Sequence, residues 1–271
     1  MNELIFLGTA GDSVVRAKQL RSSAGIVLKL NGFQFLLDPG EGTLVKMREY
    51  GLDIMKTSII LVSHHHLGHS NDLNAVIDAI TLGGIDTNGY LISTNQVING
   101  FLIGDEENKV LLTNYKRSLI KYMVVEPGQK VGVEDVEIKA TRTKHSVEGV
   151  GFVFKTPKLN IGYSSDTEFN ESIAKQYSDC DVLILNVVNP GPIRKKGNLN
   201  TKDAIDFIKV ARPRLTIITH FGVEMIKQNP ITEARKIEQE TKTEVMAAKD
   251  GLRIRLDDYS RKVYQEKLDN F

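Results

Sequence analysis

Five of the six histidines follow closely on short apolar segments of the kind that form buried strands. They are His64, His66 and His69 after residues 58–62, His145 after residues 136–141, and His220 after residues 215–219. In α/β proteins, functional side chains gather on loops at the carboxyl ends of strands, because the sheet holds those loops in place. We therefore expect a fold that brings several strand ends from distant parts of the chain to one edge.

Apolar segments bounded by turn residues recur along the chain and alternate with a few amphipathic segments. The predicted strands are residues 4–7, 24–30, 33–37, 58–62, 110–112, 119–125, 136–141, 150–155, 159–163, 182–188, 215–219, 244–247 and 252–256, and the predicted helices are residues 44–50, 70–81, 201–210 and 231–240. The Asn31-Gly32 pair is typical of a two-residue hairpin turn. No repeat or Pro/Gly/Ser-rich linker divides the chain, so we expect one α/β domain over residues 1–271, with helices outside two packed sheets.

Composition narrows the classes of function. Lys plus Arg (35) nearly cancel Asp plus Glu (34), and a net charge of +1 disfavours a non-specific nucleic-acid or membrane-surface binder. The single cysteine, Cys180, rules out an internal disulfide framework, and we interpret it as a small buried apolar residue. No apolar run reaches the ~20 residues of a membrane span, and the amino-terminal segment lacks the pattern of a signal peptide. These features predict a cytoplasmic protein.

The first three of these histidines are spaced as metal ligands. His64 and His66 are two residues apart in an extended segment, so both rings can face one ion, and His69 can turn toward a second. Neutral imidazole is a good ligand for Zn²⁺ and similar ions. The alternative is a set of surface histidines or hydrogen-bonded core histidines. His65 should point away from its neighbours in either case.

The segment Ser63-His64-His65-His66-Leu67-Gly68-His69 resembles the H-x-H-x-D-H signature of the metallo-β-lactamase superfamily. Other motifs, in the same order, are similar to those of the branch that contains ribonuclease Z and small phosphodiesterases. They are Phe6-Leu7-Gly8-Thr9, Asp38-Pro39-Gly40-Glu41-Gly42-Thr43, Thr143-Lys144-His145-Ser146, Tyr163-Ser164-Ser165-Asp166-Thr167 and Thr219-His220-Phe221. The resemblance runs from residue 4 to about residue 222 and implies a four-layer αββα sandwich of the metallo-β-lactamase type.

The resemblance also implies a ligand set. His64, His66 and His145 would form a first metal site, His69 and His220 would serve a second, and Asp166 would bridge the two. One or two Zn²⁺ ions per chain are the expected cofactors, with Mn²⁺ or iron as alternatives. For Asp38, two interpretations stay open: a carboxylate that orients a ligand histidine, or a residue that stabilises a turn.

Two positions depart from the family pattern. Gly68 stands where the signature has an aspartate that ligates the second metal and handles a proton, so we expect weaker binding of a second ion. Asn198 replaces a histidine that assists at the scissile phosphate in ribonuclease Z relatives, and it can donate a hydrogen bond but carry no charge. Asp72, close after His69, is a candidate substitute ligand or a simple helix-dipole partner. Asn200 is expected to cap the helix that follows.

Ribonuclease Z enzymes carry a protruding Gly/Pro-rich arm that grips transfer RNA, and nothing in this sequence resembles it. Firm RNA binding needs roughly 6–10 phosphate contacts. The basic runs in this half of the chain are Arg194-Lys195-Lys196 and Arg212 with Arg214. The first run is either a phosphate contact or a solvated face. We therefore expect a small phosphodiester, and not transfer RNA, as the partner.

The leading hypothesis is a metal-dependent hydrolase, a phosphodiesterase that uses metal-bound hydroxide on a small phosphodiester or nucleotide. Its candidate catalytic residues are Asp166, which positions the nucleophile, and Asn198, which contacts phosphate. Two alternatives stay open: a catalytically degenerate metal- or ligand-binding member of the same fold, and a hydrolase of esters or lactones. A homo-oligomer is compatible with the sequence.

Overall fold

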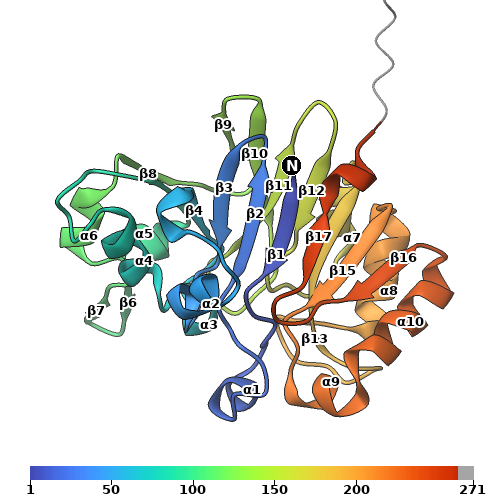
Figure 1. Cartoon of the computed structure of the whole chain (residues 1–271). Coiled ribbons are helices and arrows are strands. Elements are labelled where there is room, and N and C mark those ends of the chain that lie inside the picture. The colour runs from blue at the N-terminus through green and yellow to red at the C-terminus, as the bar shows by residue number, and fades with distance from the viewer. Residues whose placement is uncertain (262–271) are drawn as a thin grey trace, which may run out of the picture.

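The computed structural model describes residues 1–261 of the chain. Its strands form two large sheets that pack face to face (Figure 1). In spatial order the first sheet contains β17 (Arg253–Arg255), β1 (Glu3–Phe6), β2 (Ile26–Leu30), β3 (Phe33–Leu37), β4 (Thr57–Val62), β5 (Tyr90–Ser93) and β8 (Lys121–Val124). The second contains β16 (Glu244–Ala247), β15 (Leu215–Thr219), β13 (Val182–Asn189), β12 (Asn160–Tyr163), β11 (Val150–Lys155), β10 (Val136–Arg142) and β9 (Lys130–Val133), with β14 (Leu199–Asn200) paired to β13.

Helices cover the outer face of each sheet, which gives the four-layer αββα sandwich expected from the sequence (Figure 1). Those on the first sheet are α2 (Thr43–Glu49), α4 (Leu73–Ile80), α5 (Asn95–Asn99) and α6 (Thr113–Ser118). Those on the second are α7 (Glu171–Ala174), α8 (Thr201–Ala211), α9 (Val223–Gln228) and α10 (Pro230–Thr241). The remaining short elements are α1 (Ser13–Ala17), α3 (Leu67–Ser70), η1 (Ile54–Lys56), η2 (Lys175–Tyr177) and η3 (Leu256–Tyr259).

The central strands bury both of their faces, and the alternation of side chains decides which core each residue joins. On β1, Leu4 and Phe6 belong to the cluster between the sheets, whereas Ile5 belongs to the cluster under the helices of the first sheet. This explains why the strands read as continuous apolar runs in the sequence. The predicted turn at Asn31-Gly32 is confirmed, because both residues have positive φ and join β2 to β3 with Leu30 opposite Phe33.

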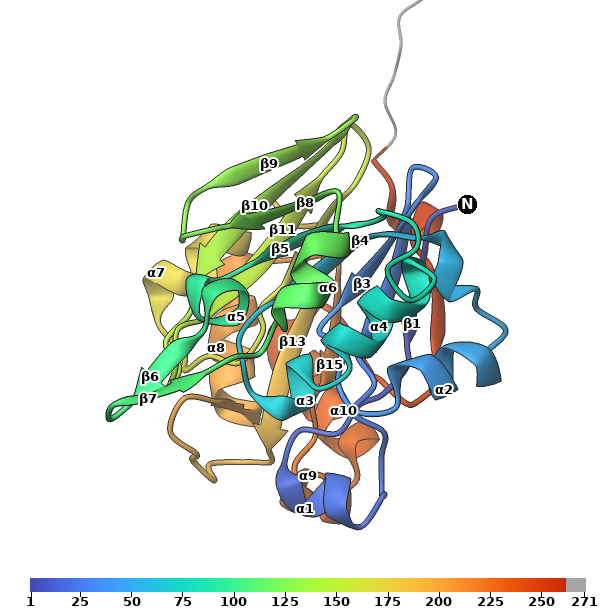
Figure 2. The ribbon, with the colours of Figure 1, turned by 90° about the vertical axis from the view of Figure 1, so that its left-hand side faces the viewer.

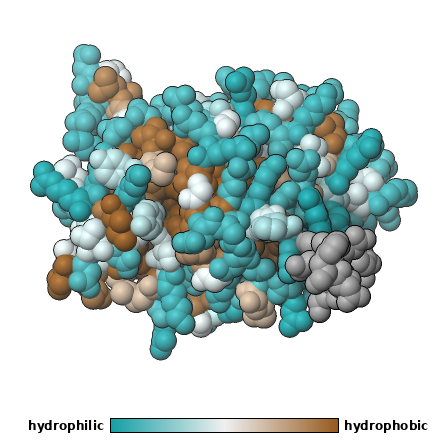
Figure 3. All heavy atoms as spheres, turned by 90° about the horizontal axis from the view of Figure 1, so that it is seen from above, coloured by the Kyte–Doolittle hydropathy of each residue, from teal (hydrophilic) through white to brown (hydrophobic). Residues whose placement is uncertain are grey.

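The directions of the strands place the functional loops. In the first sheet β3 and β4 run parallel, and in the second sheet β12, β13 and β15 run parallel while β10 is related to β12 through the antiparallel β11. The carboxyl ends of these strands therefore meet at one end of the sandwich, the lower end in Figure 1. Figure 3 views the opposite end, where apolar side chains gather, and a cavity at this end is lined by residues of β4, β5 and β8 of the first sheet and of β9 of the second.

Most predicted elements are present within two residues at either end, but two predictions need correction. Residues 110–112 were expected to form a strand and do not, because the side chain of Asn74 on α4 takes their backbone hydrogen bonds: its Nδ2 donates to the Val110 carbonyl and its Oδ1 accepts from the Leu112 amide. The helix expected over residues 70–81 begins later, as α4 at Leu73, because Ser70 ends α3 and the Asp72 amide donates to the Pro39 carbonyl.

Several short elements carried no clear sequence signal, among them the hairpin of β6 (Phe101–Ile103) and β7 (Glu106–Asn108), which projects from the body in Figure 2. Within residues 1–261, no helix combines the length and apolar character needed to cross a membrane. The predicted domain extends to residue 271, and residues 262–271 lie outside the described residues.

Candidate metal centre

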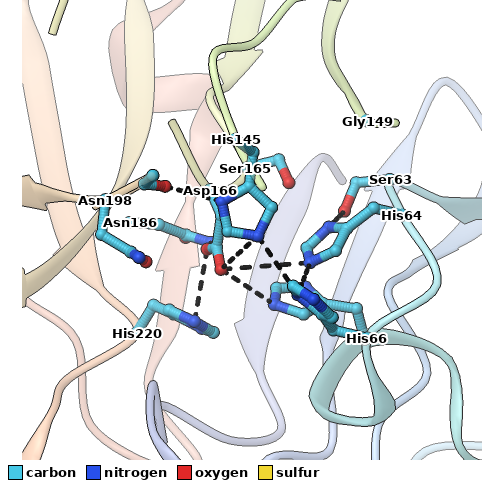
Figure 4. A network of polar contacts seen from close by, with 12 residues as sticks. Ser63, His64, His66, His145, Gly149, Ser165, Asp166, Asn186, Asn198 and His220 are labelled. Carbon is cyan, nitrogen blue, oxygen red and sulfur yellow. Dashed lines mark hydrogen bonds and ion pairs between the residues drawn. The ribbon is translucent and has the colours of Figure 1, made fainter. Parts of the chain in front are cut away.

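Five histidines and one aspartate from four separate strand ends converge at the lower end of the sandwich, as the sequence predicted (Figure 4). They follow β4, β10, β12 and β15, and they are His64, His66, His69, His145, Asp166 and His220. The residue after β15, His220, has a φ of 63°, a conformation that turns the chain sharply at the strand end. Segments more than 150 residues apart thus contribute to one cluster.

Three imidazoles form the first group of the cluster. Nε2 of His64 lies 3.0 Å from Nδ1 of His66, and Nε2 of His145 lies 3.1 Å from the same atom. The second nitrogen of His145 lies 2.7 Å from the Gly197 carbonyl oxygen, and that of His64 lies 3.0 Å from the Ser63 hydroxyl. The rings of His64 and His145, which lie on either side of His66, are therefore each oriented by a polar partner on the side away from the cluster.

Asp166 lies between this group and the other two histidines. Its Oδ2 is 3.6 Å from Nε2 of His69, 3.9 Å from that of His145 and 4.0 Å from that of His64. Its Oδ1 is 3.2 Å from Nε2 of His220 and accepts a hydrogen bond of 2.8 Å from the Asn186 amide. One carboxylate thus faces all four rings, which is the position a bridging ligand requires.

Asp38, directly after β3, orients one of these histidines. Its Oδ2 lies 2.8 Å from Nδ1 of His69 and accepts hydrogen bonds from the Tyr163 and Ser63 hydroxyls at 2.6 and 2.7 Å. Its Oδ1 accepts from the Ser63 backbone amide at 2.6 Å. Of the two interpretations of Asp38, the geometry favours a carboxylate that holds a histidine ring.

Burial and charge set the protonation of the cluster. Burial, together with neighbouring rings, lowers the pKa of His64 well below its usual value and that of His66 to about 4, so both rings are neutral at pH 7. Burial also lowers the pKa of His220. Burial alone would lower the pKa of His69, but the Asp166 and Asp38 carboxylates outweigh it and raise the pKa to about 10. Burial would raise the pKa of Asp166, and the adjacent His220 and His69 rings instead hold it well below its usual range.

These donors fit a divalent metal. A tetrahedral Zn²⁺ with Zn–N bonds of 2.0–2.1 Å keeps its ligand nitrogens about 3.3 Å apart, close to the spacing of the three imidazoles. The pair of buried carboxylates around His69 calls for a positive charge, which either a proton or a metal ion can supply. The Asn186 Oδ1 atom is buried without a hydrogen-bond partner within residues 1–261, and Asn186 lines a cavity of about 30 Å³ with His69 and His220, large enough for one water.

With glycine at position 68, Asp166 is the one carboxylate that faces the second histidine pair within residues 1–261. A Cβ atom added to Gly68 would lie 3.8 Å from Cζ of Arg16, an ordinary contact, so a side chain could stand there. Asp72 does not replace the missing group, because its Oδ2 accepts hydrogen bonds from the Gly42 and Thr43 amides at the start of α2. Asp72 is therefore a helix-capping residue of another element, the second of the two roles considered for it.

A cavity of about 270 Å³ opens onto the cluster. Asn198 lines it and donates from its side-chain amide to the Lys196 carbonyl at 3.0 Å. Lys195 and Lys196 of the predicted basic run line the same wall, and Arg16 from α1 lines it near Gly68. Asn200, as expected, caps α8, with a capping box to Asp203.

Other predictions concern residues outside the cluster. His65 points away from it, with Nδ1 2.9 Å from Oε1 of Gln96 and its ring stacked on Phe101 at 4.0 Å. Cys180 is buried, and burial raises the pKa of its thiol to about 12, so it is no nucleophile at pH 7. The sequence missed Asn186 and Arg16 as site residues. The sole signal for Asn186 was that it is a polar residue inside an otherwise apolar strand. The sequence of α1 carries no signal that would single out Arg16.

Residues 34–221 match the family described as "Beta-lactamase superfamily domain". The chain is 34% identical over 258 residues to the protein "Uncharacterized protein MJ1374" of Methanocaldococcus jannaschii, and the match covers 94% of this chain and 95% of that one. It is 26% identical over 208 residues to ribonuclease Z of Borreliella afzelii, covering 73% of this chain and 64% of the relative. The match with that enzyme therefore spans less than two thirds of its length.

Solved structures show the same fold. The crystal structure of the metallo-beta-lactamase fold protein YhfI from Bacillus subtilis superposes with a TM-score of 0.76 at 16% sequence identity, covering 93% of this chain and 98% of that one. At this identity the likeness concerns the fold, and the activity has to be argued from the site.

Proposed function

This chain belongs to the beta-lactamase superfamily, and on that premise we propose that it is a metal-dependent hydrolase whose substrate is a small phosphodiester or nucleotide. The observation that carries the proposal is the convergence of five imidazoles and one carboxylate at the floor of a polar cavity. The fold, the donor set and the ribonuclease Z relatives all support a metal-dependent hydrolase. The phosphodiester and the metal identity are the finer parts of the proposal.

Under this proposal, the first metal ion is held by the imidazoles of His64, His66 and His145, with Asp166 on the side facing the second pair. Zn²⁺ is the ion we expect, because three neutral imidazoles and a carboxylate suit it. When bound, such an ion polarises a phosphoryl oxygen and lowers the pKa of water from 15.7 to about 7.

The residues of the chain position the reactants. Asp166 accepts a hydrogen bond from Asn186 and faces the four rings. It can therefore accept a hydrogen bond from an attacking water and orient that water at the cluster. Asn198 uses its side-chain amide on the Lys196 carbonyl, which fixes its orientation, and its second amide hydrogen remains for a phosphate oxygen. Lys195 and Lys196 add positive charge on the same wall.

A second ion would have His69, His220 and Asp166 as ligands but no carboxylate from position 68. We therefore propose that the second site binds metal more weakly than the first. The degenerate alternative follows from this same position, since a site with one ion and no signature aspartate lacks a usual proton acceptor. The ester and lactone alternatives are separated from the phosphodiester by the choice of substrate in the test below.

The size of the cavity supports a small substrate. About 270 Å³ accommodates a nucleotide-sized group. The described residues between Asp166 and His220 form α7, η2, β13, β14 and α8, and none of these is a protruding arm. That transfer RNA is not a substrate remains a prediction.

The test uses the full chain, stripped of metal with a chelator and reconstituted with Zn²⁺ or Mn²⁺. Turnover of an activated phosphodiester is compared with turnover of a lactone and of an aryl carboxylic ester. We expect metal-dependent hydrolysis with the phosphodiester as the best substrate. Faster turnover of the lactone or ester would move the function to that class. A protein fully loaded with metal that hydrolyses none of the three would be a degenerate binding member.

A further inference from the structure

Arg16 places a guanidinium group on the wall of the metal-centre cavity, beside the position of the missing aspartate. It comes from the short helix α1, which Asp12 caps and Val15 anchors in the core. An ideal Cβ on Gly68 would lie 3.8 Å from both Cζ and Nη1 of Arg16, so glycine leaves the guanidinium open to the cavity. Gly68 and His69 line the same cavity, which puts Arg16 on the side of the second histidine pair.

The orientation of Arg16 is held from behind. Its Nη1 donates to Oε1 of Glu41, whose other oxygen accepts from the Ser23 hydroxyl. Within residues 1–261 this contact uses one of the five N–H donors of the guanidinium. Three quarters of the Arg16 side chain is covered, so it is fixed in place and its remaining donors are available at the cavity wall.

The charges of the cavity favour an anion. Arg16, Lys195 and Lys196 are its basic residues, and Asp12 and Asp166 its acidic ones. Both oxygens of Asp12 are already engaged, because Oδ1 accepts from the Val15 amide and Oδ2 from the Val223 amide, each at 2.8 Å. Asp166 is engaged by the histidines and Asn186. Glu41 already pairs with Arg16, so the charge left for a ligand is that of Lys195 and Lys196, which have no carboxylate partner within residues 1–261, together with the N–H donors of Arg16 that Glu41 does not use.

We propose that Arg16 is a substrate-binding residue that holds a phosphoryl oxygen next to the metal centre, on the side where the signature aspartate and a second ion would otherwise act. The inference rests on the proposed function for the identity of the anion. A guanidinium suits this task, because its planar fork matches two phosphate oxygens. It stays charged at every working pH.

Inorganic phosphate is the probe that tests this. Its affinity for the Zn²⁺-loaded full chain is measured by calorimetry for the wild type, for Arg16→Met and for Lys18→Met, a control that removes an exposed cation one position beyond α1. We expect Arg16→Met to weaken phosphate binding about 10-fold to 100-fold at unchanged zinc content. Lys18→Met should leave the affinity within about 2-fold, since an exposed surface charge has little effect.

Two more variants separate binding from a structural role. Glu41→Gln removes the negative charge beside Arg16 and keeps both an acceptor oxygen and the guanidinium, so it should bind phosphate more tightly than Arg16→Met does. Arg16→Lys keeps the charge without the fork and should show an intermediate loss; it also serves if Arg16→Met fails to fold. The inference would be overturned if the wild type, Arg16→Lys and Arg16→Met all bound phosphate with equal affinity. It would also be overturned if the wild type did not bind phosphate.

The two proposals can fail separately, because phosphate binding is measured without turnover. A protein that binds phosphate through Arg16 but hydrolyses no phosphodiester keeps the anion subsite and loses the proposed function. A protein that hydrolyses phosphodiesters equally well with Arg16→Met keeps the function and loses the subsite.

Discussion

At the scale of single residues, Asp38 carries much of the organisation of the site without touching the cavity floor. It links β3 to the histidine loop through Ser63 and His69 and to the second sheet through Tyr163. Its backbone takes a positive φ of 49°, which is uncommon outside glycine and aids the sharp turn after β3. A buried carboxylate with four partners thus holds His69 in place before any metal binds.

Replacing Asp38 tests this role. Asp38→Asn keeps the shape of the side chain and removes the charge that holds the His69 ring, so we expect the affinity for the second ion, the one that His69 serves, to fall by about 10-fold to 100-fold. Competition titration with a chromophoric chelator measures the change. Asp105→Asn, at an exposed hairpin position, is the matched control. Equal metal affinity of both variants and the wild type would leave Asp38 with a turn-stabilising role alone.

Gly68 is the second test at this scale. The Cβ of a substituted residue has room there and the backbone φ is not positive, so Gly68→Asp should fold and supply the missing carboxylate. We expect bound zinc, measured by mass spectrometry of the metal, to rise from about one to about two ions per chain. Gly68→Ala, the matched control, should stay near one.

Two tightly bound ions in the unmodified protein would contradict the account of Gly68. Because Arg16 lies beside position 68, it could capture the new carboxylate and prevent a second ion from binding. The double variant Gly68→Asp/Arg16→Met removes that competition, and a zinc content of about one in this variant would also contradict the account.

His64, His66 and His69 could be predicted from their residue type and spacing. The roles of His145, Asp166 and His220 could be predicted from the resemblance of their motifs to those of the family. Arg16 and Asn186 could not, since neither type has a distinctive spacing in its element. Their role depends on where α1 and β13 pack against loops that are far away in the sequence. Asp72 is the opposite case, because its residue type and its place near His69 suit a metal ligand. Its carboxylate instead accepts hydrogen bonds from the Gly42 and Thr43 amides.

At the scale of elements, the strands were the most predictable part of the chain. Strands β3, β11, β15 and β16 have the predicted limits, because turn residues bound each apolar run. The expected strand at 110–112 failed because a side chain from α4, Asn74, competes for its backbone groups, and such a partner lies outside any local pattern.

The loop that carries Lys195 and Asn198 is supported by α10 through a buried carboxylate. Oε2 of Glu233 accepts from the Thr201 hydroxyl at 2.5 Å, at the start of α8, and from the Gly191 amide at 3.2 Å. Its Oε1 pairs with Lys236 on the same helix. The charged form of Glu233 therefore ties three elements together below the cavity wall.

We expect Glu233→Gln to lower the free energy of unfolding by about 1–3 kcal/mol at neutral pH, because the charged acceptor of two buried donors is lost. Burial would raise the pKa of Glu233, but Lys236, Thr201 and the Gly191 amide outweigh it and lower the pKa. The stabilisation is therefore present above the unfolded-chain pKa of about 4.3 and is lost as the pH falls through the lower folded value.

Urea unfolding at neutral and acidic pH measures this effect, and the difference between Glu233→Gln and the wild type should shrink at acidic pH. Glu238→Gln, on an exposed position of the same helix, is the control and should change little. A difference that grows as the pH falls would show that the folded structure favours the neutral carboxyl.

At the scale of the whole molecule, the αββα layering follows from the strand and helix pattern together with the family motifs, but the order of strands in the sheets does not. Pairings such as β1 with β17 join residues about 250 positions apart, and local propensity carries no information about them. The consequence for function is that the floor of the site is assembled by tertiary packing, with three side chains from the end of β4 and one each from the ends of β10, β12 and β15.

The central claim is that this assembly is a metal centre that hydrolyses phosphodiesters. The most direct measurement compares zinc content and turnover of an activated phosphodiester for His66→Ala and His65→Ala, two neighbours of which the first faces the cluster and the second stacks on Phe101. We expect His65→Ala to keep its zinc content and its turnover near the wild-type values. In His66→Ala, zinc content and turnover should fall to those of the metal-free protein. Equal zinc content and equal turnover in the two variants would contradict the central claim.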